Sequence, residues 1–353
     1  MTNPTILGLT TAVPAYQHSQ TELHDRWLAH LMNSRRSRAI FTAAEIDTRY
    51  SVLPTSGFLD DEPGTQARND VYMQAARPLA AQAIECALKQ AGLAPTDIDH
   101  FIVVSCTGFD TPGLDVILAH KLGMRPDLRR SALIGMGCFA GVTALDRAML
   151  ELAARPQSRV LILAIEFTTI HFQHGDSLEN MVAGAIFGDG LAAAVIGPGS
   201  AGNGPRLLHT MTYSDYQTQA LMGVHLSDNG FQIHLSSRVS KVLRDIVPNL
   251  VADFLQQRRL AMADIKFWGI HPGGARIIDY IGQALGLESD ALRFSREVLR
   301  AHGNMSSAAI FFVLEEIMRQ GQPQANDYAV LLAFGPGLTI ELCLIQWPDC
   351  GRQ

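Results

Sequence analysis

Short apolar runs alternate with helical segments along most of this chain. β-Branched runs at 5–9, 101–106 and 159–165 predict strands, and the continuous apolar character of the last two indicates strands buried on both faces. Helical patterns cover 19–40 and the alanine-rich segment 72–92, and a further helix is expected to end near Leu122-Gly123. This alternation predicts an α/β protein with a largely parallel central sheet.

The chain also repeats itself. The segment 97–124 resembles 264–287, because each runs from Asp-Ile through a strand and glycines to a helix that ends in Leu-Gly. A glycine-bearing turn then opens an apolar helix in both, at Gly137-Cys138 and at Gly303-Asn304. The gaps in this match leave chance similarity as the alternative. A real repeat predicts pseudo-duplicated βαβαβ halves in a five-layered α-β-α-β-α arrangement, with halves at 1–215 and 216–353.

The composition suits a large globular core. Hydrophobic residues make up 47% of the 353 positions and charged residues 18%. A net charge of −6 argues against a general nucleic-acid binder. No apolar run is long enough to insert into a membrane, and the start of the chain lacks a secretion signal. The five cysteines are scattered and do not form a disulfide framework, so we expect a cytoplasmic protein with free thiols.

Cys138 is the candidate nucleophile. Small residues flank it, and they permit a tight strand-to-helix turn and close approach of a substrate to the sulfur. A helix N-terminus favours the thiolate and offers N–H groups to an oxyanion. A cysteine can also be a small buried hydrophobe. The spacing of Gly135, Gly137 and Gly141 imitates a dinucleotide fingerprint, but the next strand brings no acid before Glu166, so we reject nicotinamide binding.

His271 and Asn304 are the candidate partners of Cys138. His271 follows a buried strand and precedes Pro272-Gly273-Gly274, which would place its imidazole in a cleft, near enough to take the thiol proton. Asn304 stands in the repeat position that matches Cys138, although an asparagine there can simply cap a helix. The zinc templates are missing, so no metal is expected.

Four segments of the sequence are similar, in residues and in order, to the signature segments of the type III polyketide synthases, the chalcone-synthase superfamily. These segments are Gly137-Cys138-Phe139-Ala140-Gly141, His271-Pro272-Gly273-Gly274, Gly303-Asn304-Met305-Ser306-Ser307-Ala308 and Gly335-Pro336-Gly337-Leu338-Thr339. The resemblance runs from about Thr5 to Trp347. It implies a thiolase-like fold, a homodimer, and coenzyme A thioesters as substrates, with no tightly bound cofactor and no obligatory carrier protein.

The resemblance also implies a mechanism. Cys138 takes an acyl group from an acyl-CoA starter, and His271 and Asn304 hold the thioester oxygen of malonyl-CoA while carbon dioxide leaves. The enolate then attacks the acyl thioester, and repeated cycles end in cyclisation. We expect a pyrone or resorcinol-type product, with a fatty acyl starter preferred over a malonyl starter or a short branched one.

Further residues carry over by position. The resemblance implies that Phe187 is a gate between coenzyme A and the cavity, and that Thr111-Pro112 has a cis bond in a loop that reaches the partner subunit. The remaining carried-over positions fall into two groups. Cavity positions are Cys106, Thr107, Thr168, His171, Ser306, Gly335, Pro336 and Gly337, and positions for coenzyme A are Arg35, Arg36, Arg38, Gly273 and Gly274. His171 departs from the smaller residue common in plant members, and the three arginines can equally form a solvated helix face.

Two other functions remain open. An initiating ketoacyl-carrier-protein synthase shares the Cys, His and Asn but condenses once and needs a basic patch for its carrier protein. A relative with the same fold that only binds acyl-CoA has no chemical need for Cys138, His271 and Asn304 together. The Gly335-Pro336-Gly337 loop and the Asn304-Met305-Ser306-Ser307 run favour the polyketide synthase over the ketoacyl synthase, and the intact set of three residues argues against the binding protein.

Overall fold

The computed structural model describes residues 4–28, 34–199, 204–236 and 238–349. Within these ranges, nine strands form one sheet in the order β11-β12-β13-β8-β1-β7-β6-β4-β5. Their bounds are β1 Pro4–Ala12, β4 His100–Ser105, β5 Arg129–Ile134, β6 Val160–Phe167, β7 Asp189–Pro198, β8 Arg206–Ser214, β11 Ile265–Ile270, β12 Tyr328–Gly335 and β13 Thr339–Gln346.

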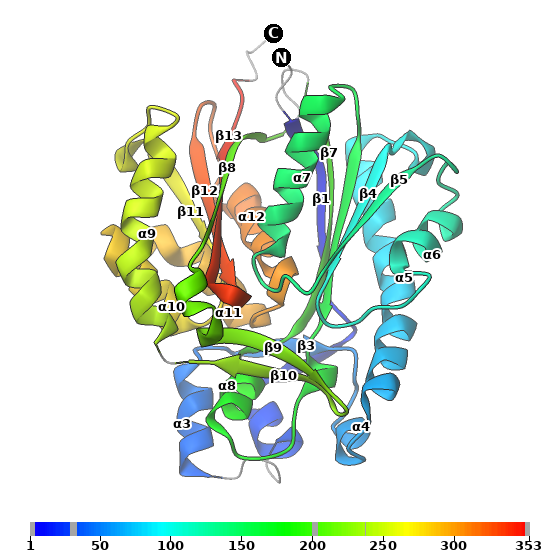
Figure 1. Cartoon of the computed structure of the whole chain (residues 1–353), viewed down its shortest axis with the longest axis vertical. Helices are drawn as coiled ribbons and strands as arrows, with labels where there is room; N and C mark the ends of the chain where they lie inside the picture. The colour runs from blue at the N-terminus through cyan, green and yellow to red at the C-terminus, as the bar shows by residue number, and fades with distance from the viewer. Residues whose placement is uncertain (1–3, 29–33, 200–203, 237, 350–353) are drawn as a thin grey trace.

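The helices divide the molecule into five layers (Figure 1). One pair of residues, Thr5 and Arg206, joins β1 to β8, so the sheet consists of two parts with a narrow connection. Helices α7 and α12 lie between the two parts, α5 and α6 cover one outer face, and α9 and α10 cover the other. The bounds are α5 Thr65–Ala91, α6 Leu114–Lys121, α7 Ala140–Ala154, α9 Val239–Gln256, α10 Ala275–Leu285, α11 Arg293–His302 and α12 Ala309–Gln320. The expected five-layered α/β architecture is confirmed, whereas the boundary between the halves stays a prediction.

Smaller elements gather at one end of the layers (Figure 1). They are β2 Tyr16–Ser19, α1 Gln20–Glu22, α3 Arg35–Ala43, β3 Thr48–Ser51, α4 Gly57–Asp60, α8 Leu178–Ile186, β9 Met222–Ser227 and β10 Gly230–Leu235. Strands β2 and β3 pair with each other, as do β9 and β10. The predicted single helix over 19–40 is wrong: α1 continues into a π-helical turn at Leu23–Trp27, and α3 begins separately after Ser34, whose side chain caps it.

The sheet is mixed, which corrects the expectation of a largely parallel one. Strands β4, β5 and β6 are parallel, as are β11 and β12, but the other pairs run antiparallel. The short Gly335-Pro336-Gly337-Leu338 connection joins β12 directly to β13, and strands joined by a tight turn must run antiparallel. The predicted strands at 101–106 and 159–165 are confirmed as β4 and β6.

Strand β4 explains why its sequence is apolar throughout. Ile102 and Val104 face the core around α7 and α12, while Phe101 and Val103 face the core beneath α5. All four side chains are buried, because the strand has a helix layer on each side. Because β4 lies between two helix layers, its carboxyl end and the following Cys106 lie beside the central helices.

Gly141 sets the distance between the two central helices. A Cβ at this position of α7 would lie 2.4 Å from the carbonyl oxygen of Ser307 and 2.8 Å from the side chain of Ile310. Only glycine therefore allows α7 to approach the start of α12 this closely. This approach brings the turn before α7, which carries Cys138, near the turn before α12, which carries Asn304.

Replacement of Gly141 by alanine is expected to destabilise the protein. The added methyl group must push the two helices apart, and overpacking of this kind costs about 2 kcal/mol. Urea unfolding followed by circular dichroism measures the loss. Gly223→Ala serves as the control, because a Cβ at Gly223 would meet no atom within 4 Å. Equal unfolding midpoints for the two variants would contradict this packing argument.

Candidate active site

A single cavity collects side chains from distant parts of the chain. Its volume is about 1000 Å³ with the open mouth included. Its lining comprises Cys106, Thr107, Gly137, Cys138, Thr168, His171, Phe172, Gln173, Asn180, Ala183, Gly184, Ile186, Phe187, Met222, Gly223, Val224, Phe231, Ile233, Leu235, His271, Gly273, Ile277, Asn304, Ser306, Phe334 and Pro336. Cys138 thus shares one cavity with His271 and Asn304, which follow it by more than a hundred positions in the sequence.

Cys138 lies in the turn two residues before α7. Gly135 and Gly137 give this turn its shape, with φ of 75° and 77°, values that favour glycine. A Cβ on Gly137 would meet the ring of Pro336 at 2.5 Å, and one on Gly335 would lie 3.1 Å from the backbone nitrogen of Cys138. The loop between β12 and β13 therefore packs directly behind the nucleophile, where no larger residue fits.

Burial dominates the acidity of Cys138. It raises the pKa of the thiol to about 11, while hydrogen bonds from Ser306 and Asn304 act in the opposite direction. The expectation that the helix N-terminus favours the thiolate stays a prediction. Thiolate formation requires a base in the cavity to take the proton.

His271, the base predicted from the sequence, lines the same cavity. It directly follows β11, and its backbone N–H donates to the carbonyl of Leu332 at 2.8 Å, which continues the strand pairing. Its ring meets Phe334 edge-on, at 5.5 Å between centroids. Neither ring nitrogen has a hydrogen-bond partner among the described residues, although the side chain is fully buried. Burial lowers the pKa of His271 to about 3, so the imidazole is neutral and one nitrogen is free to accept a proton.

Asn304 is held by backbone pairing rather than by a helix cap. It forms an isolated parallel bridge with Phe187, and its N–H donates to the carbonyl of Ile186 at 2.7 Å. Its side-chain oxygen accepts the N–H of Ser306 at 2.8 Å. Because that oxygen is occupied, the amide NH₂ is the group left to donate toward Cys138. Of the helix-capping role considered for Asn304, only this hydrogen bond with the backbone of Ser306 remains.

Glu166 is a site residue that sequence reasoning did not select. It lies near the end of β6, fully buried, and accepts hydrogen bonds from the Cys106 backbone at 3.0 Å and the Thr107 hydroxyl at 2.7 Å. The Ser307 hydroxyl donates to it as well. Burial raises the pKa of this carboxyl, opposed by these donors. A signal was present, since Glu166 is the one charged residue in the apolar sequence of β6.

His171 forms hydrogen bonds with two separate segments of the cavity wall. Its Nε2 donates to the carbonyl of Thr107 at 2.6 Å, and its Nδ1 accepts the N–H of Phe231 at 3.4 Å. Burial lowers the pKa of His171 to about 4, so the ring is neutral at physiological pH. The Phe231 contact anchors the hairpin of β9 and β10, whose apolar side chains form much of the cavity. Sequence reasoning missed this hairpin, because its alternating pattern does not reveal which face is buried.

The predicted positions separate into those that line the cavity and those that do not. Phe187, Cys106, Thr107, Thr168, His171, Ser306, Pro336 and Gly273 line it. Gly335 and Gly337 lie in the loop behind Cys138, and Gly274 precedes α10 with φ of 147°. Arg35, Arg36 and Arg38 are exposed on α3, outside the cavity lining. Nη2 of Arg38 lies 3.7 Å from Oδ1 of Asp25. The cis Thr111-Pro112 bond is confirmed.

The described residues also bear on metal binding and on membrane-spanning helices. Within the described ranges, no group of three or more His, Cys, Asp or Glu side chains could hold a metal ion. In the same ranges, none of the helices combines the length and the apolar character needed to cross a membrane.

The chain matches two family models along nearly its whole length. Residues 2–200 match the N-terminal domain of chalcone and stilbene synthases, and residues 210–347 match the C-terminal domain. A 1,3,6,8-tetrahydroxynaphthalene synthase from Streptomyces peucetius subsp. caesius is 33% identical over 350 residues, which covers 97% of this chain and 93% of that protein. A 3,5-dihydroxyphenylacetyl-CoA synthase from Amycolatopsis balhimycina is 33% identical, with 96% and 92% covered.

Solved structures share the fold. The 1,3,6,8-tetrahydroxynaphthalene synthase from Streptomyces coelicolor A3(2), a bacterial type III polyketide synthase, superposes with a TM-score of 0.91 at 29% identity and covers 98% of this chain and 99% of its own. A polyketide synthase from the brown alga Ectocarpus siliculosus gives a TM-score of 0.91 at 26% identity, with 98% of each chain covered. The thiolase-like fold expected from the sequence is therefore confirmed.

Removal of the imidazole is expected to make Cys138 less reactive near neutral pH. Without His271 as proton acceptor, burial holds the pKa of the thiol high, and only the thiolate reacts. In His271→Gln, the pH at which iodoacetamide labels Cys138 half as fast as its maximum should rise by at least about one unit. Peptide mass spectrometry distinguishes Cys138 from Cys106. His209→Gln, on β8, is the control, and coincident pH profiles for the two variants would reject His271 as the base.

Proposed function

This chain belongs to the chalcone and stilbene synthase family, the type III polyketide synthases, and we propose that Cys138, His271 and Asn304 carry out its condensation chemistry. Enzymes of this family are acyltransferases that condense malonyl-CoA iteratively onto a starter, without a carrier protein. The observation that carries the residue assignment is the shared cavity, which is lined by a half-buried thiol, an unpartnered buried imidazole and an amide donor. Nothing in the comparisons favours a carrier-protein-dependent ketoacyl synthase.

Loading is the first step of the proposed mechanism. His271 accepts the thiol proton, the sulfur of Cys138 attacks the thioester carbon of the acyl-CoA starter, and the C–S bond to coenzyme A breaks. The proton then passes from the imidazolium to the departing thiolate of coenzyme A. The N–H groups at the start of α7 are close to the tetrahedral oxyanion, which they stabilise.

Extension is the second step. The thioester oxygen of malonyl-CoA accepts hydrogen bonds from the Asn304 amide and from a protonated nitrogen of His271, and the C–C bond to the carboxylate breaks to release carbon dioxide. The electron pair remains as an enolate, whose carbon attacks the acyl thioester and expels the sulfur of Cys138. Phe187, which forms a bridge with Asn304 at the cavity wall, is the proposed gate between coenzyme A and the cavity.

This chemistry requires no bound cofactor, because decarboxylation itself generates the nucleophile. We therefore propose that coenzyme A thioesters enter as substrates only, with Gly273 and Gly274 and the arginines of α3 as the candidate contacts for coenzyme A. The thiols of Cys86, Cys106, Cys138 and Cys343 are all unpaired, which suits a reducing compartment, and we propose that the enzyme works in the cytoplasm.

The cavity lining favours a starter with a hydrocarbon group. The lining includes Phe172, Ile277 and the apolar side chains of β9 and β10, beside polar residues such as Gln173 and Asn180. No lysine or arginine is among the lining residues that the structure describes. A free carboxylate on the starter would have no cation to pair with there. We propose an apolar acyl-CoA starter, and a malonyl starter is the competing outcome.

One free edge of the sheet supports a homodimer. Strand β5 is one of the two terminal strands, and its N–H and C=O groups on one side have no partner strand in the described chain. Ile134, the last residue of β5, is 53% exposed, and Phe109, which lines the same surface pocket, is 59% exposed. An open strand edge with large exposed apolar side chains fits a second copy of the chain, with the Thr111-Pro112 loop directed into that interface.

A panel of starters tests the proposed function. With malonyl-CoA and an octanoyl-CoA or longer starter, we expect pyrones or resorcinols that carry the starter chain plus several two-carbon units. Cys138→Ala should form none of them, because the acyl group has no attachment point. Mass spectrometry identifies the products. Formation of a polyketide from malonyl-CoA alone, and of no product that carries a fatty acyl chain, would reject the apolar starter but retain the family activity.

A charge at the sheet edge should break the dimer. Phe109→Asp combined with Ile134→Asp places carboxylates where the partner strand would dock, and sedimentation equilibrium should then give the monomer mass. Tyr216→Asp, at a position that is 76% exposed in the 3₁₀ helix Tyr216–Leu221, is the matched control and should remain dimeric. A wild-type protein that sediments as a monomer would contradict the dimer.

A further inference from the structure

Arg49 is a fully buried cation next to the cavity. It lies on β3, and its side chain has no exposed surface. Nη1 donates to the carbonyl oxygens of Gly184 at 2.7 Å and Phe187 at 2.6 Å, and Nη2 donates to the side-chain oxygen of Gln20 at 2.7 Å. No carboxylate lies within ion-pair distance of it in the described ranges. An arginine buried without a direct ion pair is costly, which calls for an account of what its hydrogen bonds achieve.

The carbonyls that Arg49 binds belong to the end of α8. The last carbonyls of a helix lack intrahelical partners, and a cation there is favoured by the helix dipole. Gly184 lies in the last turn of α8, and Phe187 is the residue at which the helix ends. Arg49 therefore fixes the place where the chain leaves the helix, and with it the backbone of the gate residue.

The same side chain touches the segment that carries Asn304. Phe187 and Asn304 form a short parallel bridge, in which Gly188 donates its N–H to the carbonyl of Asn304 at 3.1 Å. The stem of Arg49 packs against the glycine before Asn304: a Cβ on Gly303 would lie 2.8 Å from Cδ of Arg49. Gly303 has φ of 71°, a conformation that suits glycine. Arg49 therefore contacts both segments of the bridge, the one at Phe187 and the one that carries Asn304.

Gln20 completes this support. Its side-chain oxygen accepts from Arg49, while its amide donates to the carbonyl of Ala185 at 2.9 Å and to that of Phe41 at 3.3 Å. The guanidinium also lies 6.0 Å from the ring centroid of Phe172, a cavity residue. Arg49 and Gln20 together thus hold successive carbonyls of α8 from behind the cavity wall.

We propose that Arg49 is a positioning residue for decarboxylation, which holds Phe187 and Asn304 in register so that the amide of Asn304 meets the thioester oxygen of malonyl-CoA. The inference rests on the proposed role of Asn304. Loading of Cys138 does not depend on this register, because the nucleophile is placed by the α7 turn and the β12–β13 loop. Displacement of a positioned donor by about 1 Å can cost about 100-fold in rate.

The test separates the two partial reactions in the same protein sample. Decarboxylation is followed as conversion of malonyl-CoA to acetyl-CoA without a starter, and loading is followed as the mass increase of the intact protein with an acyl-CoA. In Arg49→Met we expect kcat for decarboxylation to fall by about 100-fold, and in Arg49→Lys by about 10-fold, with KM little changed. Loading should stay within about threefold of the wild-type rate, which also reports that the variant is folded.

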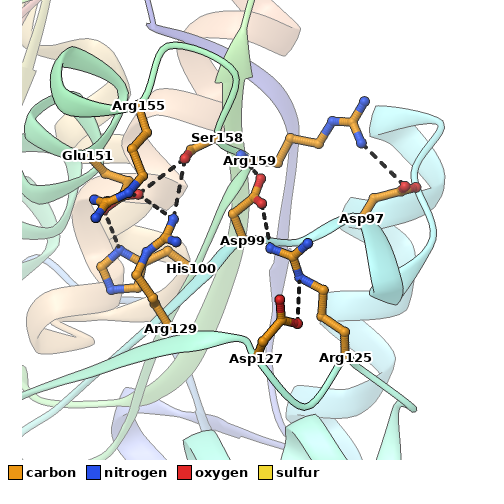
Figure 2. A network of polar contacts seen from close by, with 10 residues as sticks. All are labelled: Asp97, Asp99, His100, Arg125, Asp127, Arg129, Glu151, Arg155, Ser158 and Arg159. Atoms are coloured by element: carbon orange, nitrogen blue, oxygen red, sulfur yellow. Dashed lines mark hydrogen bonds and ion pairs between the residues drawn. The ribbon is translucent and has the colours of Figure 1, made fainter.

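Gln20→Leu provides a second variant if Arg49→Met does not fold. It keeps the cation but removes one of its acceptors, so a smaller loss of decarboxylation with normal loading is expected. Arg125→Met is the matched control for general destabilisation. Arg125 pairs with Asp99 and Asp127 in a network at the opposite end of β4 from the cavity (Figure 2). The Arg125→Met variant should lose stability without a selective loss of decarboxylation.

Three results would overturn the positioning role of Arg49. Normal decarboxylation in a folded Arg49 or Gln20 variant would overturn it. Parallel loss of decarboxylation and loading, in proportion to the loss of thermal stability seen with Arg125→Met, would overturn it in favour of a structural role. Retention of decarboxylation by Asn304→Ala would instead reject the proposed role of Asn304, and the positioning inference with it.

Discussion

Gly141 of α7 lies directly against the backbone that precedes α12, and the arrangement of the cavity depends on this contact. The two helices form the central layer, and the turns that open them carry Cys138 and Asn304. A glycine is needed because the Ser307 carbonyl occupies the space where any side chain would begin. The contact also orients Ser307, whose hydroxyl donates to Glu166, so the helix crossing is linked to the polar end of the cavity.

Loss of water governs the electrostatics of this cavity. Burial disfavours charge on Cys138, on His271 and on Glu166, each by the same mechanism. In the proposed mechanism the thiol and the imidazole are both neutral at rest, and the proton moves between them when a thioester arrives. Exclusion of water in that mechanism also protects the enolate from protonation.

Charged groups next to the cavity are held by backbone atoms instead of by opposite charges. Glu166 accepts from the backbone of Cys106 and from hydroxyl groups, and Arg49 donates to the carbonyls at the end of α8. Such bonds have fixed directions, and they tie each side chain to a particular turn of the chain. The segments they fix, at Cys106, Phe187 and Asn304, all border the cavity.

The sequence by itself determined the family and the layered α/β architecture. Cys138, His271 and Asn304 are predicted from glycine-bearing turns and from the repeat, because a turn that must bring backbone close to a substrate restricts its residues locally. The buried strands β4 and β6 were identified because residues covered on both faces must be apolar.

The tertiary structure alone decided what depends on contacts between distant segments. The mixed direction of the sheet, the break in the predicted helix at 19–40, the wall formed by β9 and β10, and the roles of Glu166 and Arg49 are of this kind. Glu166 and Arg49 carry charge, which in a sequence indicates a surface position. Only the folded chain supplies the partners that make their burial possible, since those partners are backbone groups and hydroxyls dozens to more than a hundred positions away.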